Sequence, residues 1–246
     1  MSPRDGAIEV DGRTPLLVVT GMARESRLAA GPGTIVVASG GNTDRLNARL
    51  ATRGCGDCHA VLSFGIAGGL NSAVNTGNVI LATNIVAGNR RWSADTDLAD
   101  RLAGRLLDGG VKTLRAGIAG SDAPILNAKA KATLWGESQA SAVDMESHVA
   151  AEFAAAHGLP FAALRVVCDP HSRDLPALAA NALGPDGAIS LPNVLAGLVR
   201  EPAQAVALPR LARESQRAFS MLRRCRDLLG IGRGRPDLIQ LFGDIA

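Results

Sequence analysis

The sequence predicts an α/β fold, with a mostly parallel, twisted central sheet flanked by helices on both faces. The first observation is that short apolar runs rich in β-branched residues recur along the chain, as buried strands require. The second is that segments of helical periodicity lie between several of these runs, an alternation typical of parallel sheets. The expected strands are 16–20, 34–38, 60–64, 78–82, 114–118 and 161–167, and the expected helices between them are 42–52, 95–109, 128–137 and 145–157.

The length of 246 residues suits one large domain, so a second core is not required. We expect residues 1–246 to form a single domain, with a core over about 15–200 and a basic helical C-terminal extension over about 201–246. After residue 170 the sequence predicts a long loop, a helix at 194–200 and an arginine-rich helix at 209–229.

Composition excludes several classes of function. Aromatic residues make up 3% of the chain, without a single Tyr, so stacking platforms for nucleic acid are not expected. The N-terminal segment lacks the apolar core of a signal peptide, and no apolar run is long enough to span a membrane. Four cysteines are too few for a disulfide scaffold. We therefore expect a cytoplasmic protein.

Known cofactor and metal motifs are also missing from the sequence. There is no G-x-G-x-x-G followed by an acidic residue, no G-x-x-x-x-G-K-[ST] and no G-x-S-x-G. The four histidines have no ligand spacing, although Cys55 and Cys58 form a C-x-x-C pair that leaves a redox or zinc site as an alternative. We expect no metal and no cofactor.

Glycines gather where strands are expected to end. Gly21, Gly40 with Gly41, and Gly65 with Gly68 and Gly69 each follow a predicted strand or its last residues. Because ligands of open α/β sheets bind outside the carboxyl ends of the strands, these turns predict the position of a binding site.

Acidic residues and small loops lie at the ends of four of the expected strands, in the segments 21–25, 64–69, 121–124 and 165–169. A fifth segment, 143–147, precedes the last of these strands. In this order and at these intervals, the set resembles the superfamily of nucleoside phosphorylases and methylthioadenosine/adenosylhomocysteine nucleosidases, over roughly residues 15 to 172. The resemblance implies cleavage of the N-glycosidic bond of a purine nucleoside, with no cofactor other than inorganic phosphate as a co-substrate of the phosphorylases.

The resemblance also implies roles for individual residues. Asp169 matches the acid that hydrogen-bonds or protonates N7 of the departing purine, and a general acid contributes about 10² to 10⁴ in rate. Glu146 matches the carboxylate that binds the ribose hydroxyls. Pro124 stands where nucleosidases often place an aromatic residue. The implied substrate-binding residues are Met145, Glu146, Asp122, Ala123, Pro124, Ile125, Gly68, Gly69 and Cys168.

At the other end of the site, two interpretations of the nucleophile remain, water and phosphate. Glu25 matches the residue that orients water in the nucleosidases, and Ile66 replaces a Ser that many members carry. Arg24 and the Ser39–Gly40–Gly41 turn instead favour an oxyanion such as phosphate. The implied phosphate or water site comprises Gly21, Arg24, Ser39, Gly40, Gly41 and Ile66, with Glu25 as the second catalytic residue.

The C-terminal part resembles the hopanoid-associated phosphorylase subgroup, which is linked to release of adenine from adenosylhopane in hopanoid biosynthesis. For the arginine-rich helix 209–229, two interpretations stay open: peripheral contact with anionic lipid at the inner face of the membrane, and packing on its own domain. The resemblance implies a homo-oligomer, most simply a homodimer. The alternatives are a methylthioadenosine/adenosylhomocysteine nucleosidase and a non-catalytic nucleoside sensor.

Overall fold

A mixed sheet with helices on both sides forms the protein. The structure is a computed structural model, which describes residues 14–54, 58–177, 184 and 187–233. The strands are β1 (Leu16–Thr20), β2 (Thr34–Ala38), β3 (Ala60–Gly69), β4 (Val79–Ala87), β5 (Arg90–Ser93), β6 (Thr113–Gly120), β7 (Ala142–Asp144) and β8 (Phe161–Asp169). The helices are α1 (Ala23–Ala29), α2 (Thr43–Arg53), α3 (Thr96–Asp108), α4 (Ala128–Ser138), α5 (Ser147–Ala156), α6 (Leu191–Arg200), the 3₁₀ helix η2 (Pro202–Ala207) and α7 (Leu208–Leu229).

The strand order is β2-β1-β3-β7-β6-β4-β5, and β8 pairs with both β3 and β4. The pairs β1–β2, β1–β3, β3–β8, β4–β6 and β6–β7 are parallel. The pairs β3–β7, β4–β5 and β4–β8 are antiparallel. The predicted fold class, an α/β protein with a mostly parallel sheet, is confirmed.

Several strands are longer than their apolar runs predict. Gly65, Gly68 and Gly69 lie inside β3 and not after it, because this stretch continues to pair with β8. β5 and β7 were not predicted. β5 is a short strand with exposed arginines that pairs with β4, and β7 is only three residues long, so neither has an apolar run that would reveal it.

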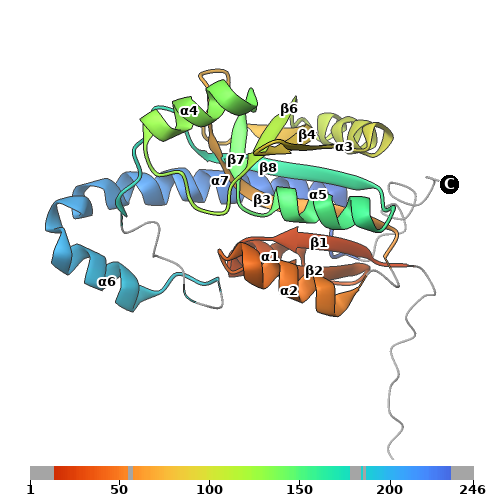
Figure 1. The fold of residues 1–246 in the computed structure, drawn as a ribbon, viewed down its shortest axis with the longest axis horizontal. Coiled ribbons are helices and arrows are strands. Elements are labelled where there is room, and N and C mark those ends of the chain that lie inside the picture. The colour runs from red at the N-terminus through yellow and green to blue at the C-terminus, as the bar shows by residue number, and fades with distance from the viewer. Residues whose placement is uncertain (1–13, 55–57, 178–183, 185–186, 234–246) are drawn as a thin grey trace, which may run out of the picture.

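Alternating side chains of the strands contribute to two large apolar clusters, one on each face of the sheet. In β1, Leu16 and Val18 face a cluster that includes α1, α3 and α7, whereas Leu17 and Val19 face a cluster that includes α2 and α5. This alternation follows from the two-residue period of a strand. The predicted layers of helices on both faces are confirmed (Figure 1).

Helix α7 is part of the first cluster. Phe219, Leu222 and Leu229 are buried with Ala218 and Cys225 against β8 and α3. The hydrophobic core therefore extends through α7, well beyond the end near residue 200 that the sequence suggested. This packing supports the interpretation that the helix packs on its own domain, and contact of its basic side chains with lipid stays a prediction.

Helix α6 stands apart from the sheet, at one end of the molecule (Figure 1). None of its residues is buried, and Leu191, Leu195 and Val199 are exposed. Among the helices that the structure describes, none combines the length and the apolar character needed to cross a bilayer.

Candidate functional site

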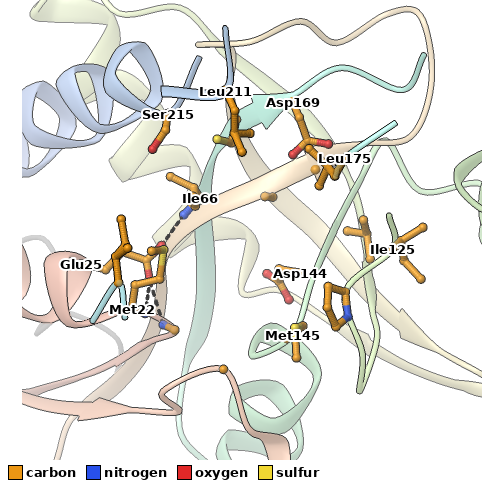
Figure 2. Close-up of a pocket in the computed structure, with 18 of the residues that line it drawn as sticks. Met22, Glu25, Ile66, Ile125, Asp144, Met145, Asp169, Leu175, Leu211 and Ser215 are labelled. Atoms are coloured by element: carbon orange, nitrogen blue, oxygen red, sulfur yellow. Dashed lines mark hydrogen bonds between the residues drawn. The ribbon is translucent and has the colours of Figure 1, made fainter. Parts of the chain in front are cut away.

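A cavity of about 490 Å³ opens where β1, β3, β7 and β8 end. Figure 2 shows Glu25, Asp144 and Asp169 spaced around this cavity. Its position is the one that open α/β sheets use for ligands, because loops diverge at the carboxyl ends of the strands. The residues from the predicted site that line it are Gly21, Glu25, Gly41, Ile66, Gly68, Ala123, Pro124, Ile125, Met145, Glu146, Cys168 and Asp169.

The carboxyl group of Glu25 is fixed by backbone donors at the base of the cavity. Its Oε2 accepts hydrogen bonds from the N–H of Gly21 (2.8 Å) and of Met22 (2.7 Å), and its Oε1 accepts one from the N–H of Ile66 (2.8 Å). Burial raises the pKa of Glu25, and the charge of Arg165 partly offsets this rise. Both lone pairs of Oε2 are engaged, whereas Oε1 has one lone pair left, so Glu25 retains the capacity to bind a water molecule through Oε1.

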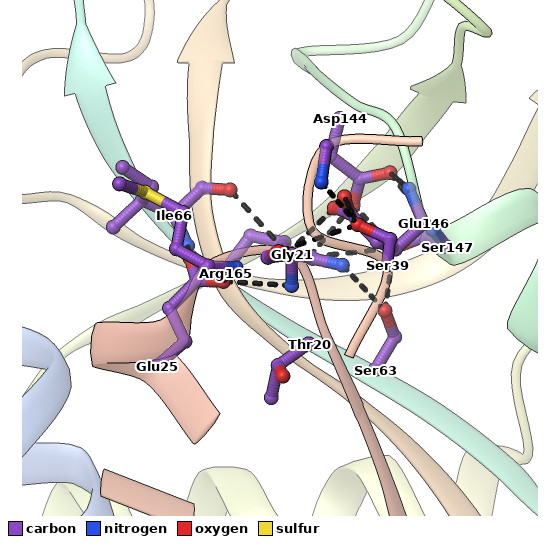
Figure 3. A network of polar contacts seen from close by, with 12 residues as sticks. Thr20, Gly21, Glu25, Ser39, Ser63, Ile66, Asp144, Glu146, Ser147 and Arg165 are labelled. Atoms are coloured by element: carbon purple, nitrogen blue, oxygen red, sulfur yellow. Dashed lines mark hydrogen bonds and ion pairs between the residues drawn. The ribbon is translucent and has the colours of Figure 1, made fainter. Parts of the chain in front are cut away.

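Arg165 joins two of the acidic residues that line the cavity, Asp144 and Glu146 (Figure 3). It is fully buried in the middle of β8. Its Nε lies 2.7 Å from Oδ2 of Asp144, and its Nη1 lies 3.5 Å from Oε2 of Glu146. Its Nη2 donates to Oγ of Ser63 (2.6 Å). A buried charge has to be paired, so Arg165 fixes the carboxylates that surround it.

Asp144 links this network to the start of α5. Its Oδ1 accepts hydrogen bonds from the N–H of Glu146 (3.2 Å) and of Ser147 (2.9 Å), and its Oδ2 accepts one from the hydroxyl of Ser147. The helix start is thereby held in place, and Glu146 is presented to the cavity.

Glu146 is buried between two strand ends. The hydroxyl of Ser39 donates to its Oε1 at 2.8 Å, and a side chain on Gly21 would lie 2.7 Å from the same oxygen. Burial raises the pKa of Glu146 to about 7, with Arg165 acting in the opposite direction and Asp144 adding to the rise. Gly21 therefore makes room for a carboxyl group that titrates near neutral pH.

Asp169 ends β8 at the cavity wall and is paired with a lysine from α4. Lys131 Nζ donates to its Oδ2, and both side chains are buried. Burial raises the pKa of Asp169, and the Lys131 ammonium lowers it. The adjacent Cys168 also lines the cavity; burial raises the pKa of its thiol to about 12, so this part of the wall is uncharged near neutral pH.

Five residues of the predicted site do not line the cavity. The guanidinium of Arg24 stacks on the ring of Phe219, 4.1 Å from its centroid. Asp122 is largely exposed and pairs with His148. Gly69 packs against Val74 and Val167, whereas Ser39 supports Glu146 and Gly40 donates its N–H to the carbonyl of Gly21.

Arg165, Lys131 and the cavity-lining Asp144 were not identified as site residues from the sequence. Arg165 had one available signal, because a charged residue in the middle of an apolar strand must have a buried partner. Lys131 lies on the same helix face as Leu134 and Ser138, at helical spacing. A lysine on an inward face also indicates a buried partner, but less strongly than a charged residue in an apolar strand does.

The redox or zinc alternative concerned Cys55 and Cys58. Cys55 lies outside the described residues, and Cys58 is buried. Within the part of the chain that the structure describes, no three His, Cys, Asp or Glu side chains are grouped to hold a metal ion.

The sequence matches the family model of the phosphorylase superfamily over residues 8–183. The chain belongs to the phosphorylase superfamily. The match covers the strands β1 to β8 and every carboxyl group described above. No curated protein matches the chain by sequence.

Solved structures agree on the fold of this phosphorylase-superfamily protein. The futalosine hydrolase of Helicobacter pylori has a TM-score of 0.63 at 15% identity, covering 87% of this chain and 97% of that one. A 5′-methylthioadenosine/S-adenosyl homocysteine nucleosidase of H. pylori, in complex with a pyrrolopyrimidine compound, has a TM-score of 0.64 at 15% identity (88% and 99% covered). The corresponding nucleosidase of Campylobacter jejuni has a TM-score of 0.57 at 15% identity (82% and 99% covered).

Proposed function

We propose that the protein cleaves the N-glycosidic bond of a purine nucleoside, with Asp169 as the general acid. The observation that supports this most is the gathering of Glu25, Glu146 and Asp169 around one cavity, although they are far apart in the sequence. Within the phosphorylase superfamily, this reaction requires an acid for the base, a carboxylate for the sugar and a group that directs the nucleophile.

The chemistry explains why three carboxyl groups are needed. As the C1′–N9 bond breaks, its electron pair goes to the purine, and Asp169 supplies a proton to N7. Such a proton transfer contributes about 10² to 10⁴ in rate because an adenine anion is a poor leaving group. Glu146 accepts hydrogen bonds from the ribose hydroxyls, and its negative charge favours the oxocarbenium character of the sugar.

We infer that water is the nucleophile and that Glu25 orients it. The N–H groups of Gly40 and Gly41 are bound within the protein, to the carbonyl of Gly21 and the hydroxyl of Ser39. Arg24 is held on Phe219. The three groups that would have favoured phosphate are therefore engaged elsewhere, whereas Glu25 reaches the cavity.

The outer part of the cavity favours a nucleoside with a bulky apolar substituent on its ribose. Residues that follow β8 supply an apolar wall there, comprising Leu175, Ile189, Val194, Leu208, Leu211 and Ala212. Together with the subgroup resemblance, this wall supports adenosylhopane as the substrate. Methylthioadenosine or adenosylhomocysteine is the second candidate, favoured by the similarity in fold to the nucleosidases.

The test is to incubate the protein separately with adenosylhopane, methylthioadenosine and adenosine, with and without phosphate, and to quantify free adenine and the sugar product. We expect adenine from adenosylhopane without phosphate, and a loss of roughly 10² to 10⁴ in Asp169→Asn. The exposed Asp97→Asn is the matched control. Dependence on phosphate would make the protein a phosphorylase, and no adenine from any substrate would favour a nucleoside sensor.

A further inference from the structure

Lys131 is among the largest fully buried side chains of the described protein. It belongs to α4, a helix whose other lysine, Lys129, is exposed. Burial of a lysine is unfavourable unless its ammonium group is paired and hydrogen-bonded, so this position requires a specific partner.

The partners of Lys131 account for its whole hydrogen-bonding capacity. Its Nζ donates to Oδ2 of Asp169, to the carbonyl of Pro170 (3.0 Å) and to the carbonyl of Arg173 (3.1 Å). An ammonium group has three N–H donors, and here each has an acceptor. Lys131 has no N–H left for a ligand, and any effect on a bound substrate has to pass through Asp169.

The contact leaves one oxygen of Asp169 free to serve the cavity. Among the residues that the structure describes, none donates a hydrogen bond to Oδ1, and the side chain remains 10% exposed at the cavity wall. The other charged groups that act on Asp169 are Glu214 of α7 and Arg173, which pair with each other. Lys131 alone among these charges contacts the Asp169 carboxyl group directly.

We propose that Lys131 is a positioning residue for Asp169: it holds Oδ2, directs Oδ1 to the leaving base and stabilises the carboxylate that proton donation creates. This proposal rests on the proposed function. In the step concerned, the Oδ1–H bond of Asp169 breaks and an N–H bond forms at N7. The electron pair of the C1′–N9 bond passes to the purine, and Lys131 keeps its protons throughout.

Loss of the Lys131 charge has a defined effect on titration. A positive charge in contact with a carboxyl group typically lowers its pKa by about 1 to 3 units. In Lys131→Gln the pKa of Asp169 should therefore rise by that amount. Because the reaction needs protonated Asp169, activity falls as pH rises through this pKa, and the descending limb of the pH profile should move upward by about 1 to 3 units.

The experiment compares wild type, Lys131→Gln and the exposed control Lys129→Gln. The Asp169 carboxyl is titrated directly by ¹³C NMR in protein labelled at the aspartate carboxyl carbons, with its signal assigned through Asp169→Asn. We expect an upward shift of the titration midpoint in Lys131→Gln only. The pH profile of kcat/KM should shift in parallel, with kcat lowered roughly 10- to 100-fold.

A double variant distinguishes an effect of Lys131 that passes through Asp169 from a loss of activity caused by misfolding. Lys131→Gln combined with Asp169→Asn should be as active as Asp169→Asn alone, because Lys131 acts through Asp169. An unchanged Asp169 titration in Lys131→Gln, or a further loss of activity in the double variant, would overturn the proposal. If the wild type releases no base while the titration still shifts, the proposed reaction fails and the coupling of Lys131 to Asp169 stands.

Discussion

At the scale of single residues, burial changes what Glu146 does between pH 5 and 8. Its pKa is raised to about 7 mainly because the charged carboxylate is poorly solvated, although Arg165 opposes the rise. Folded protein therefore holds a proton between pH 4.5 and about 7 that the unfolded chain has released. The contribution of Glu146 to stability is present at low pH and is lost as pH rises through about 7.

The titration of Glu146 should affect activity in the direction opposite to its effect on stability. If the ribose hydroxyls bind to ionised Glu146, kcat/KM should rise with pH through about 7, and Glu146→Gln should abolish this rise and lower the rate by roughly 10². The exposed Glu137→Gln provides the control. A pH profile in which Glu146→Gln keeps the ascending limb would assign that limb to another group.

Gly65 shows how the absence of a side chain positions charged groups. A Cβ at this position would lie 2.5 Å from Nη1 of Arg165 and 2.5 Å from Oε1 of Glu25. Both groups are buried and hydrogen-bonded, so neither has room to move aside. The glycine is needed here for close packing and not for a turn, since it lies inside β3.

Gly65→Ala should therefore reduce both stability and activity. We expect a loss of about 1 to 3 kcal/mol in the free energy of unfolding, typical of overpacking, measured by urea denaturation. Gly104→Ala in α3 is the control, because a Cβ there would meet nothing within 4 Å. A helical alanine at that position should be neutral or slightly stabilising. Equal effects of the two substitutions would contradict this account.

At the scale of elements, α7 combines a charged surface with an apolar inner face. Phe219 and Leu222 fill the space over the sheet. Several of its arginines bind the domain itself: Arg226 donates to the carbonyl of Leu28, and Arg224 to the carbonyl of Gly109. The basic residues that suggested a lipid surface therefore also attach the helix to α1 and to the end of α3.

Leu222→Ala should destabilise the protein by about 2 to 5 kcal/mol, since the side chain is fully buried. Its neighbour Arg223 is exposed, and Arg223→Ala should change the free energy of unfolding by less than about 0.5 kcal/mol. Thermal or urea unfolding of both variants measures the contrast. A mild effect of Leu222→Ala would mean that α7 contributes little to the core.

At the scale of the whole molecule, the cavity is completed by segments from both ends of the chain. Its inner part is formed by strand ends and their carboxyl groups, and its outer part by the loop after β8, α6 and α7. Under the proposed function, the inner part would hold the purine nucleoside, and the outer part would select among substituents on the ribose. The predicted homodimer is a separate question, to be answered by measuring the molar mass in solution.

Leu211→Asp tests this division. A charge in the apolar outer wall should raise KM for a nucleoside with a bulky apolar substituent by about tenfold or more, because a buried unpaired charge is costly. Activity on adenosine should change little. Ser215→Ala, which removes only a hydroxyl from the same part of α7, is the milder companion variant. A uniform loss on both substrates would argue against a separate outer subsite.

The sequence by itself determined the α/β class and most strand positions, and its resemblance to the superfamily gave Glu25, Glu146 and Asp169 but not Asp144, which also lines the cavity. Apolar periodicity carries the information on the fold, because it depends on residues close together in the sequence. Tertiary structure decided what lies behind the carboxyl groups: Arg165 under Glu146, Lys131 on Asp169, and α7 in the core. These depend on burial and on contacts between distant segments, and a charged residue looks the same in the sequence whether water or another buried charge surrounds it.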